Sequence, residues 1–214
     1  LPAPESAPVP AAVERAARLA RPADAGHFDE LHGSAADAGT APQGLAPDWA
    51  TFFEALGPEG FGDLDRRQDT LRRQIRDNGI SYNVYADASG PQRPWSLDLF
   101  PLIVAPGDWR HIERGIQQRV RLLERIAADV YGPRELLRAG LLPAALIRGH
   151  PGYLRPMVGV EPVGGTRLRI AAFDLARGPD GHWWVVSQRT QAPSGLGYLL
   201  ENRVLVSRLF PQAF

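Results

Sequence analysis

The sequence predicts a mixed α/β (α+β) fold in which helices flank a mixed sheet. Residues 108–131 repeat apolar side chains at helical spacing, whereas 166–190 form two strand-like runs around an Asp-Gly turn. A further strand-like run at 80–85 alternates apolar with smaller or polar residues. Strands dispersed among helices are typical of this fold class, and no internal repeat is visible.

The bulk composition excludes several classes of partner and chemistry. The 214 residues carry a formal net charge of zero, so we expect neither a nucleic acid nor an anionic membrane as partner. Apolar runs are too short to span a bilayer, and the absence of cysteine rules out disulfides and thiolate catalysis. We therefore expect a cytoplasmic protein. All 24 basic residues are arginine, which excludes lysine chemistry within this chain.

Composition divides the chain near residue 45. Residues 1–45 are rich in Ala, Pro, Gly and Ser and predict a flexible arm, with a short helix at 11–21. Residues 46–214 contain the predicted helices and strands, and we expect them to be the α/β portion of a longer protein.

The first half of this portion predicts two helices and two strands. The helices cover 48–56 and 61–79, and Gly79 stands where a helix end requires positive φ. The strands cover 80–85 and 99–105.

The second half begins with the long helix at 108–131 and a short helix that ends near Gly140. Prolines and glycines divide 141–160 into strand-like pieces and loops. The hairpin at 166–190 follows, and 194–210 returns to a helix. Predicted core positions on the long helix are Ile112, Ile116, Val120, Leu123, Ala127 and Val130.

The strand-to-helix corner TQAPSGLGYLLENR (190–203) is the first candidate site. Glycines and a helix N-terminus expose backbone N–H groups that suit phosphate or carboxylate, and Arg189 could bind the same anion. The alternative, which the sequence pattern alone favours, is a purely structural role. In it Ser194 caps the helix, while Gly195 and Gly197 permit close packing.

Asp174 is the second candidate, because a carboxylate within a predicted strand must be exposed, paired with arginine or bound to metal. An ion pair with Arg177 or Arg189 is about as well supported by the pattern as a metal site. The histidines are scattered singly, and none has a partner at ligand spacing. We expect Trp183 and Trp184 to fill core and cover a sheet edge rather than stack on a base.

Four segments in order resemble the N-terminal part of the circularly permuted ATP-grasp proteins related to glutathionylspermidine synthase. The resemblance covers roughly 28–214. The segments read NGISYNVYADASGPQRPW (78–95), DWRHIERGIQQRVRLLERIAADVYG (108–132), LLPAALIRGHPGYLRP (141–156) and WWVVSQRTQAPSGLGYLLENRVLVSRLFP (183–211). The resemblance implies an ATP-dependent carboxylate–amine ligase that forms an acyl phosphate from a small peptide or amino acid and then transfers the acyl group to an amine.

The resemblance also implies roles for particular residues. Asp174 and Arg177 match an Asp-Leu-x-Arg strand of the family. Asp174 and Arg189 are the implied catalytic residues, with Asp174 also a magnesium ligand. Residues implied to contact nucleotide or substrate are Gln188, Ser194, Gly195, Tyr198, Asn202 and Arg203.

The chain departs from the family at one point. Related short proteins read Glu-Asp-Asn at the strand end, where this chain has Ser187, Gln188 and Arg189, which weakens the usual magnesium site. Either Arg189 replaces a metal by neutralising phosphate, or the domain is a degenerate scaffold that binds a nucleotide, peptide or partner domain. The resemblance implies lysines that contact the nucleotide, and this chain has none. They must come from the C-terminal part of a longer protein, so we expect this segment alone to be inactive.

Overall fold

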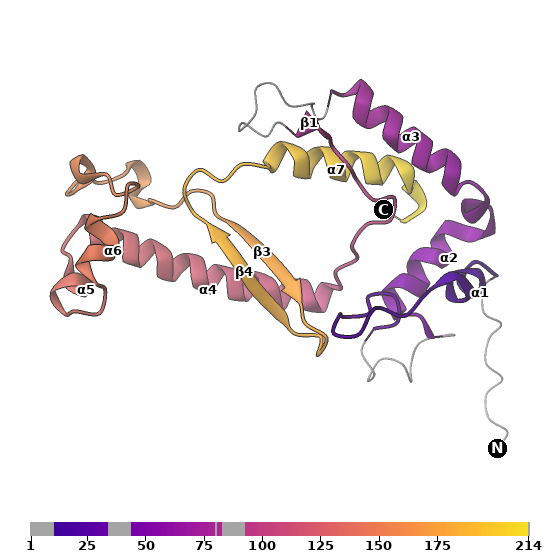
Figure 1. Ribbon diagram of the computed structural model, residues 1–214, viewed down its shortest axis with the longest axis horizontal. Helices are drawn as coiled ribbons and strands as arrows, with labels where there is room; N and C mark the ends of the chain where they lie inside the picture. Colours follow the sequence, from indigo (N-terminus) through magenta and orange to yellow (C-terminus); the bar gives the residue numbers. More distant parts are fainter. Residues whose placement is uncertain (1–10, 34–43, 80, 83–92, 214) are drawn as a thin grey trace, which may run out of the picture. The chain divides into compact units, whose positions relative to one another are not determined.

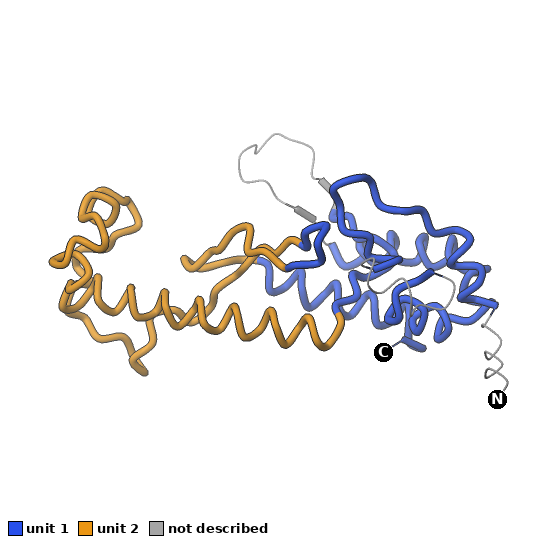
Figure 2. Tube along the Cα trace, turned by 90° about the horizontal axis from the view of Figure 1, so that it is seen from below, with its two compact units in different colours: residues 1–104, 177–182, 195–214 blue, residues 105–176, 183–194 orange. Residues whose placement is uncertain are grey.

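The computed structural model describes residues 11–33, 44–79, 81–82 and 93–213 (Figure 1). Helices predominate and are accompanied by two small two-stranded sheets, which confirms the predicted mixed fold class. In the described residues these two separate sheets stand in place of the single mixed sheet that was expected. The chain forms two compact units, coloured separately in Figure 2. Unit 1 comprises Leu1–Val104, Arg177–His182 and Gly195–Phe214, and unit 2 comprises Ala105–Ala176 and Trp183–Ser194.

Unit 1 is mostly helical. Its elements are α1 (Ala11–Leu19), α2 (Pro47–Gly62), α3 (Leu64–Asp77), β1 (Ser81–Tyr82), β2 (Arg93–Pro94), α7 (Leu196–Leu209) and the short 3₁₀ turn η4 (Pro211–Ala213). The two short strands pair antiparallel, with Ser81 opposite Pro94. The helices predicted at 48–56 and 61–79 are confirmed, and Gly79 has the expected positive φ of 63°.

Helix α2 supplies most of the large side chains of the unit 1 core. It begins with Pro47, whose fixed φ suits the first helical turn. Trp49, Phe52 and Phe53 are spaced three and four residues apart, so they lie on one face and are all buried. The face is interrupted at Gly57, where a φ of 68° kinks the helix.

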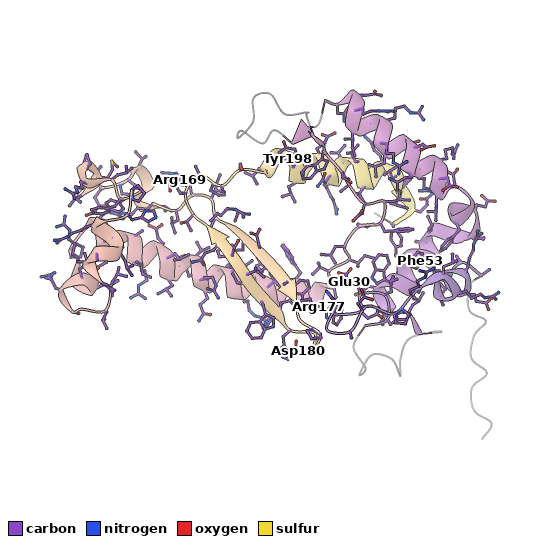
Figure 3. The ribbon with its side chains drawn as sticks, in the orientation of Figure 1. Glu30, Phe53, Arg169, Arg177, Asp180 and Tyr198 are labelled. Atoms are coloured by element: carbon purple, nitrogen blue, oxygen red, sulfur yellow. The ribbon has the colours of Figure 1, made fainter. Side chains whose placement is uncertain are left out.

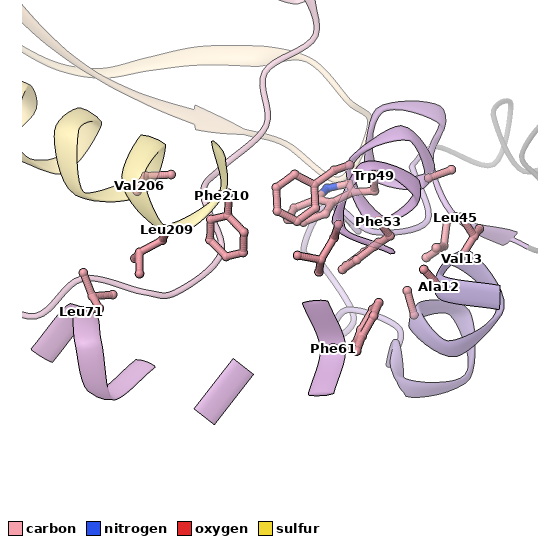
Figure 4. Packing of buried hydrophobic residues seen from close by; sticks show 14 of the residues in the cluster. Ala12, Val13, Leu45, Trp49, Phe53, Phe61, Leu71, Val206, Leu209 and Phe210 are labelled. Carbon is pink, nitrogen blue, oxygen red and sulfur yellow. The ribbon is translucent and has the colours of Figure 1, made fainter. Parts of the chain in front are cut away.

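An aromatic cluster joins α2 to segments far away in the sequence (Figure 4). The ring centroids of Phe52 and Phe210 are 5.3 Å apart, and Phe100 stacks on Phe210 at 5.9 Å. Phe100 also meets the edge of Trp49 at 6.5 Å. Aromatic pairs in this range gain energy beyond their buried area. The cluster therefore holds the end of α7 and the segment before α4 against α2.

The predicted flexible arm is packed over part of its length. Residues 11–19 form α1, as expected, but Ala12, Val13 and Ala16 are buried in the core instead of loosely held. Leu45 is fully buried as well. Small side chains suffice here because they lie against the large aromatic face of α2, so the arm needs no bulky residues of its own.

The strand predicted at 99–105 is not formed. This segment is irregular, and β1 pairs with β2 instead. Phe100 and Ile103 are apolar because they pack on the core cluster, while Pro101 lacks the N–H that a strand would donate. Of the strand predicted at 80–85, residues 81–82 are confirmed and the others lie outside the described residues.

Unit 2 is built around the long helix α4 (Pro106–Tyr131), which confirms the predicted helix. All six predicted core positions on α4 are buried or half-buried. The carboxylate of Glu124 accepts hydrogen bonds from the backbone N–H groups of Arg167 and Leu168, at 2.7 to 3.1 Å. Asp129 likewise accepts from the first backbone N–H groups of α5 (Glu135–Arg138). Two acidic side chains of α4 thus fix the chain that follows it.

The segment 141–160 differs from its prediction. It contains the helix α6 (Ala144–Arg148) and the 3₁₀ turn η2 (Arg155–Met157), with no strand among these described residues. A second 3₁₀ turn, η3 (Val163–Gly165), follows. Short apolar runs do not distinguish strands from short helices by periodicity, which accounts for the error.

The predicted hairpin is confirmed. Strand β3 (Ala172–Arg177) pairs with β4 (Trp183–Arg189), and the N–H of Gly178 donates to the carbonyl of His182 at 2.8 Å. Gly181 of the Asp-Gly turn has a φ of 81°, as such turns require.

We predict that Leu205→Ala destabilises the protein by about 2 to 5 kcal/mol, because it leaves a cavity in the core. Leu205 is fully buried, whereas Leu200 on the same helix is 66% exposed. The matched variant Leu200→Ala should change the unfolding free energy by no more than about 0.5 kcal/mol. Urea denaturation followed by tryptophan fluorescence measures both. Equal effects would contradict the packing described for α7.

Candidate functional site

The predicted site residues fall into two groups, one in each unit. The first group lies on the hairpin and at its end, in unit 2, and comprises Asp174, Gln188, Arg189 and Ser194, with Ser187 between them on β4. The second group lies on and before α7, in unit 1, and comprises Gly195, Tyr198, Asn202 and Arg203. Tyr198 is labelled near the start of α7 in Figure 3.

The hairpin brings Asp174 and Arg189 together in a bidentate ion pair. Nη1 of Arg189 donates to Oδ2 of Asp174 at 2.8 Å, and Nη2 donates to Oδ1 at 2.9 Å. The hydroxyl of Ser187 also donates to Oδ2. Both side chains are about half exposed, at 48% for Asp174 and 55% for Arg189. Of the two ion pairs that the sequence left open, the structure forms the one with Arg189.

Arg177 has a different role. Its guanidinium lies 3.9 Å from the centroid of the Phe28 ring, and Nε donates to the carbonyl of Gly181 at 3.2 Å. Cation–π contacts of this kind stabilise the packing of a surface loop. Arg177, the arginine of the Asp-Leu-x-Arg motif, therefore packs within unit 1. These contacts give it a structural role.

The ion pair lowers the pKa of Asp174 below its usual value of 3.8, chiefly through the hydrogen bonds from Arg189 and then through that from Ser187. Both carboxylate oxygens already accept hydrogen bonds, and a guanidinium cation lies beside them. A magnesium ion does not fit at Asp174 in this arrangement, because it would have to displace Arg189 against charge repulsion. Among the described residues, no three His, Asp or Glu side chains group as metal ligands.

Arg189 keeps hydrogen-bonding capacity while paired. A guanidinium carries five N–H donors, of which Asp174 takes one from each terminal nitrogen. The remaining donors, including Nε–H, can bind a second anion in the same plane. The carboxylate thus orients a fork at the end of β4 that suits phosphate or carboxylate.

The strand-to-helix corner differs from the capping alternative. Helix α7 begins at Leu196 with Gly195 at the N-cap, where φ is 111° and no side chain caps the helix. Ser194 is therefore not the N-cap. A side chain at Gly195 or Gly197 would meet no described atom within 4 Å, so close packing does not explain these glycines.

The backbone of this corner is strained at one further residue. Ala192 has a φ of 43°, a left-handed conformation that costs a residue with a β-carbon about 1 kcal/mol or more. Such strain is frequent at functional sites. Separately, no side chain caps the start of α7, which leaves the first N–H groups of that helix available to an anion.

On α7, Tyr198 and Asn202 share one partner, Trp95. The rings of Tyr198 and Trp95 stack with centroids 4.6 Å apart, and the indole N–H donates to Oδ1 of Asn202 at 3.1 Å. Glu201 lies about one turn after Tyr198 on α7, and its carboxylate accepts a hydrogen bond from the side-chain amide of Asn78. Arg203 and Gln188 are exposed. This group positions the aromatic ring of Tyr198 on the helix surface.

Sequence reasoning missed Trp95. It stands in a Pro- and Gly-rich stretch that predicts only a turn. The sequence does indicate that Trp95 makes tertiary contacts, because a tryptophan in a polar turn needs a partner both for its ring and for its N–H. The partner itself, more than 100 residues later, could not be identified without the fold.

Residues 101–214, which are 114 of the 214 residues, match the family described as circularly permuted ATP-grasp type 2. An uncharacterised protein of Mycobacterium leprae is 37% identical over 163 residues, 76% of this chain and 28% of the relative. An uncharacterised protein of Mycobacterium tuberculosis (strain H37Rv) is 38% identical over 178 residues, covering 79% of this chain and 20% of the relative.

A relative from Synechocystis, also uncharacterised, is 31% identical over 174 residues, covering 81% of this chain and 36% of its own length. The chain therefore spans between about a fifth and about a third of the curated relatives it matches. Both groups of candidate residues lie within the family match, whereas Trp95 precedes it. No helix in the described ranges has the length and apolar character needed to span a membrane.

We predict that Arg189→Gln raises the pKa of Asp174 toward 3.8, because the variant removes the hydrogen bonds and charge that favour the ionised carboxylate. In the wild type the carboxylate stays ionised, and the ion pair persists, until the pH falls through a pKa below 3.8. The ¹³C chemical shift of the Asp174 carboxyl, followed by NMR against pH, measures this. Arg177→Gln is the control and should leave the titration unchanged. A titration unaffected by Arg189→Gln would show that the pair does not form in solution.

Proposed function

We propose, from the premise that this chain belongs to the circularly permuted ATP-grasp type 2 family, that it forms part of an ATP-dependent ligase joining a carboxylate to an amine. A carboxylate oxygen of the substrate attacks the γ-phosphorus of ATP, and ADP leaves. The amine then attacks the acyl carbon, the amide bond forms, and phosphate leaves with the substrate oxygen. The acyl substrate is a small peptide or amino acid, and the relation to glutathionylspermidine synthases is part of this proposal.

The observation that carries the proposal is the oriented guanidinium of Arg189. It ends β4 within the family match, is held in plane by Asp174, and keeps unused donors at a half-exposed surface. Donors that are already oriented need no reorganisation when negative charge develops, so they stabilise a phosphoryl transition state more effectively. In this role Arg189 binds the transferring phosphate, and Asp174 is its positioning residue.

The other residues are assigned by the family relationship and by their exposure. Gln188 directly precedes Arg189 and Ser194 follows it by five residues, and both are exposed, as a phosphate contact requires. For Gly195, Tyr198, Asn202 and Arg203 we keep contact with nucleotide or substrate as the proposed role. ATP supplies the phosphoryl group when bound, and we place Mg²⁺ on carboxylates of the longer protein instead of on Asp174.

The longer protein is itself a proposed partner of this chain. Helix α7 exposes Leu196, Leu199 and Leu200 by 53%, 63% and 66%. Apolar side chains clustered on one helix face favour an intramolecular or intermolecular contact. Because the relatives are several times longer than this chain, we assign that contact to the remaining C-terminal ATP-grasp part, which also supplies the missing lysines. This chain alone is then inactive.

A second candidate function is a degenerate scaffold that binds a nucleotide or peptide without turnover. The Asp174–Arg189 pair favours it, because the carboxylate that would hold metal is neutralised by its own neighbour. The same pair thus supports either an arginine that replaces a metal or a site that has lost its metal.

Calorimetric titration of ATP, with and without Mg²⁺, into this chain and into the longest form that contains it tests the proposal. We expect binding by the long form alone. Arg189→Gln should weaken it about tenfold to hundredfold, the effect of removing a charged hydrogen bond from a phosphate. Asp174→Asn, which keeps the cation but loses its orientation, should weaken binding less than Arg189→Gln does.

The matched control is Arg114→Gln, an exposed arginine of α4 that should not affect ATP. Absence of binding by the long form in both conditions would contradict the ligase. Unchanged affinity in Arg189→Gln would leave the ligase standing but remove Arg189 from its phosphate site.

A further inference from the structure

A groove of about 780 Å³ lies within unit 2, between one face of α4 and the β3–β4 hairpin. Every residue of this unit is described. The groove is distinct from the Asp174 group, none of whose members lines it. It is lined by His111, Ile112, Gly115, Ile116, Gln118, Arg119, Arg121, Leu122, Arg125, Leu175, Trp183, Trp184 and Val185.

The charge of the groove is of one sign. Its lining contains three arginines and a histidine and no acidic residue. Within unit 2, Arg121 is bonded to the amide of Gln117, and neither Arg119 nor Arg125 has a carboxylate within salt-bridge distance. The nearby carboxylates of Glu124 and Asp129 are occupied by backbone N–H groups. A chain of zero net charge thus carries a local cationic groove.

The floor of the groove is apolar. Ile112 is buried and Trp183 is half-buried, whereas Trp184 is 61% exposed and Leu122 is 58% exposed. The expectation that the two tryptophans fill core and cover a sheet edge holds only in part, because Trp183 is only half-buried and Trp184 is mostly exposed. Exposed aromatic and aliphatic surface beside arginines is typical of surfaces that bind other proteins.

The groove runs along α4 from His111 to Arg125, and its three arginines lie between residues 119 and 125. His111 and Arg125 are separated by 14 residues of α4, a rise of about 21 Å at 1.5 Å per residue. One carboxylate or phosphate group cannot reach both ends. An extended chain of about six residues, at about 3.3 Å per residue, spans this distance. The length of the groove therefore favours an extended ligand, with its negative charges at the end that carries the arginines.

We propose that this groove binds an acidic peptide segment in extended conformation, with an apolar or aromatic side chain against Trp184. Carboxylates of the peptide pair with Arg119 and Arg125, and their burial against the apolar floor strengthens these pairs. The partner is a protein or peptide with alternating acidic and apolar residues. This site is independent of the proposed ligase reaction, since it needs neither ATP nor Arg189.

A nucleic acid fits the groove less well than a peptide does. Single-stranded nucleic acids need successive aromatic platforms on which their bases stack, and here the exposed rings are the indole of Trp184 and the small imidazole of His111. The remaining floor is formed by aliphatic side chains such as Ile112, Ile116 and Leu175, which suit the side chains of a peptide.

Fluorescence anisotropy tests the proposal with the longest form of the protein that contains this chain. The probe is the hexapeptide EELEWE with an amino-terminal fluorescein, and its matched control is QQLQWQ with the same label. Binding of the acidic probe should weaken about threefold to fivefold in Arg119→Gln and in Arg125→Gln, and should fall with salt. Arg110→Gln, an exposed arginine of α4 outside the groove, should leave affinity unchanged.

Three results would overturn the proposal: equal binding of the neutral peptide, wild-type affinity in both groove variants, or tighter binding of a labelled six-nucleotide oligothymidine. Trp184→Ala gives a further check, because it leaves the charge of the groove unchanged. It should weaken binding of the acidic probe, whereas the control Arg110→Gln should not. Circular dichroism confirms that each variant is folded. The titrations contain no ATP, so a negative result for peptide binding leaves the ligase proposal untouched, and the reverse also holds.

Discussion

The packing of Phe210 against Phe52 and Phe100 is the constraint on which unit 1 depends. These three residues come from the end of α7, from α2 and from the irregular segment before α4, so their contact closes loops of more than 100 residues. Loop closure of this length costs entropy, which only extensive apolar burial offsets. Because α7 is fixed at its C-terminal end by Leu205, Leu209 and Phe210, its N-terminal half is free to present polar and aromatic side chains at the surface.

A second constraint acts within the hairpin. The Asp174–Arg189 pair is half exposed, and pairs of this kind contribute little to stability. Its value lies instead in orientation, since a bidentate contact fixes the plane of the guanidinium. The pair also decides the chemistry of the site. An aspartate that accepts from Ser187 and Arg189 is a poor metal ligand, and an arginine that keeps free donors is a suitable phosphate ligand.

Periodicity was enough to predict α2, α3, α4, α7 and the hairpin, since each has a regular apolar pattern or a characteristic turn. It failed at 99–105 and 141–160, where apolar residues serve tertiary packing or short helices. The site was predictable in outline: Asp174 and its pairing with an arginine follow from the cost of a carboxylate in a strand. The choice between Arg177 and Arg189, and the stacking of Trp95 on Tyr198, depend on register and on contacts between distant segments, which local sequence does not encode.

The central claim is that the longer protein activates a carboxylate by phosphorylation. It is tested most directly by supplying the longest form with ATP, Mg²⁺, an amine mixture, and amino acids and small peptides labelled with ¹⁸O in their carboxylates. If an acyl phosphate forms, the phosphate released carries one ¹⁸O from the substrate, as mass spectrometry would show. Phosphate released without label would identify simple hydrolysis of ATP, and no release of phosphate would identify a scaffold. Either result would contradict the account.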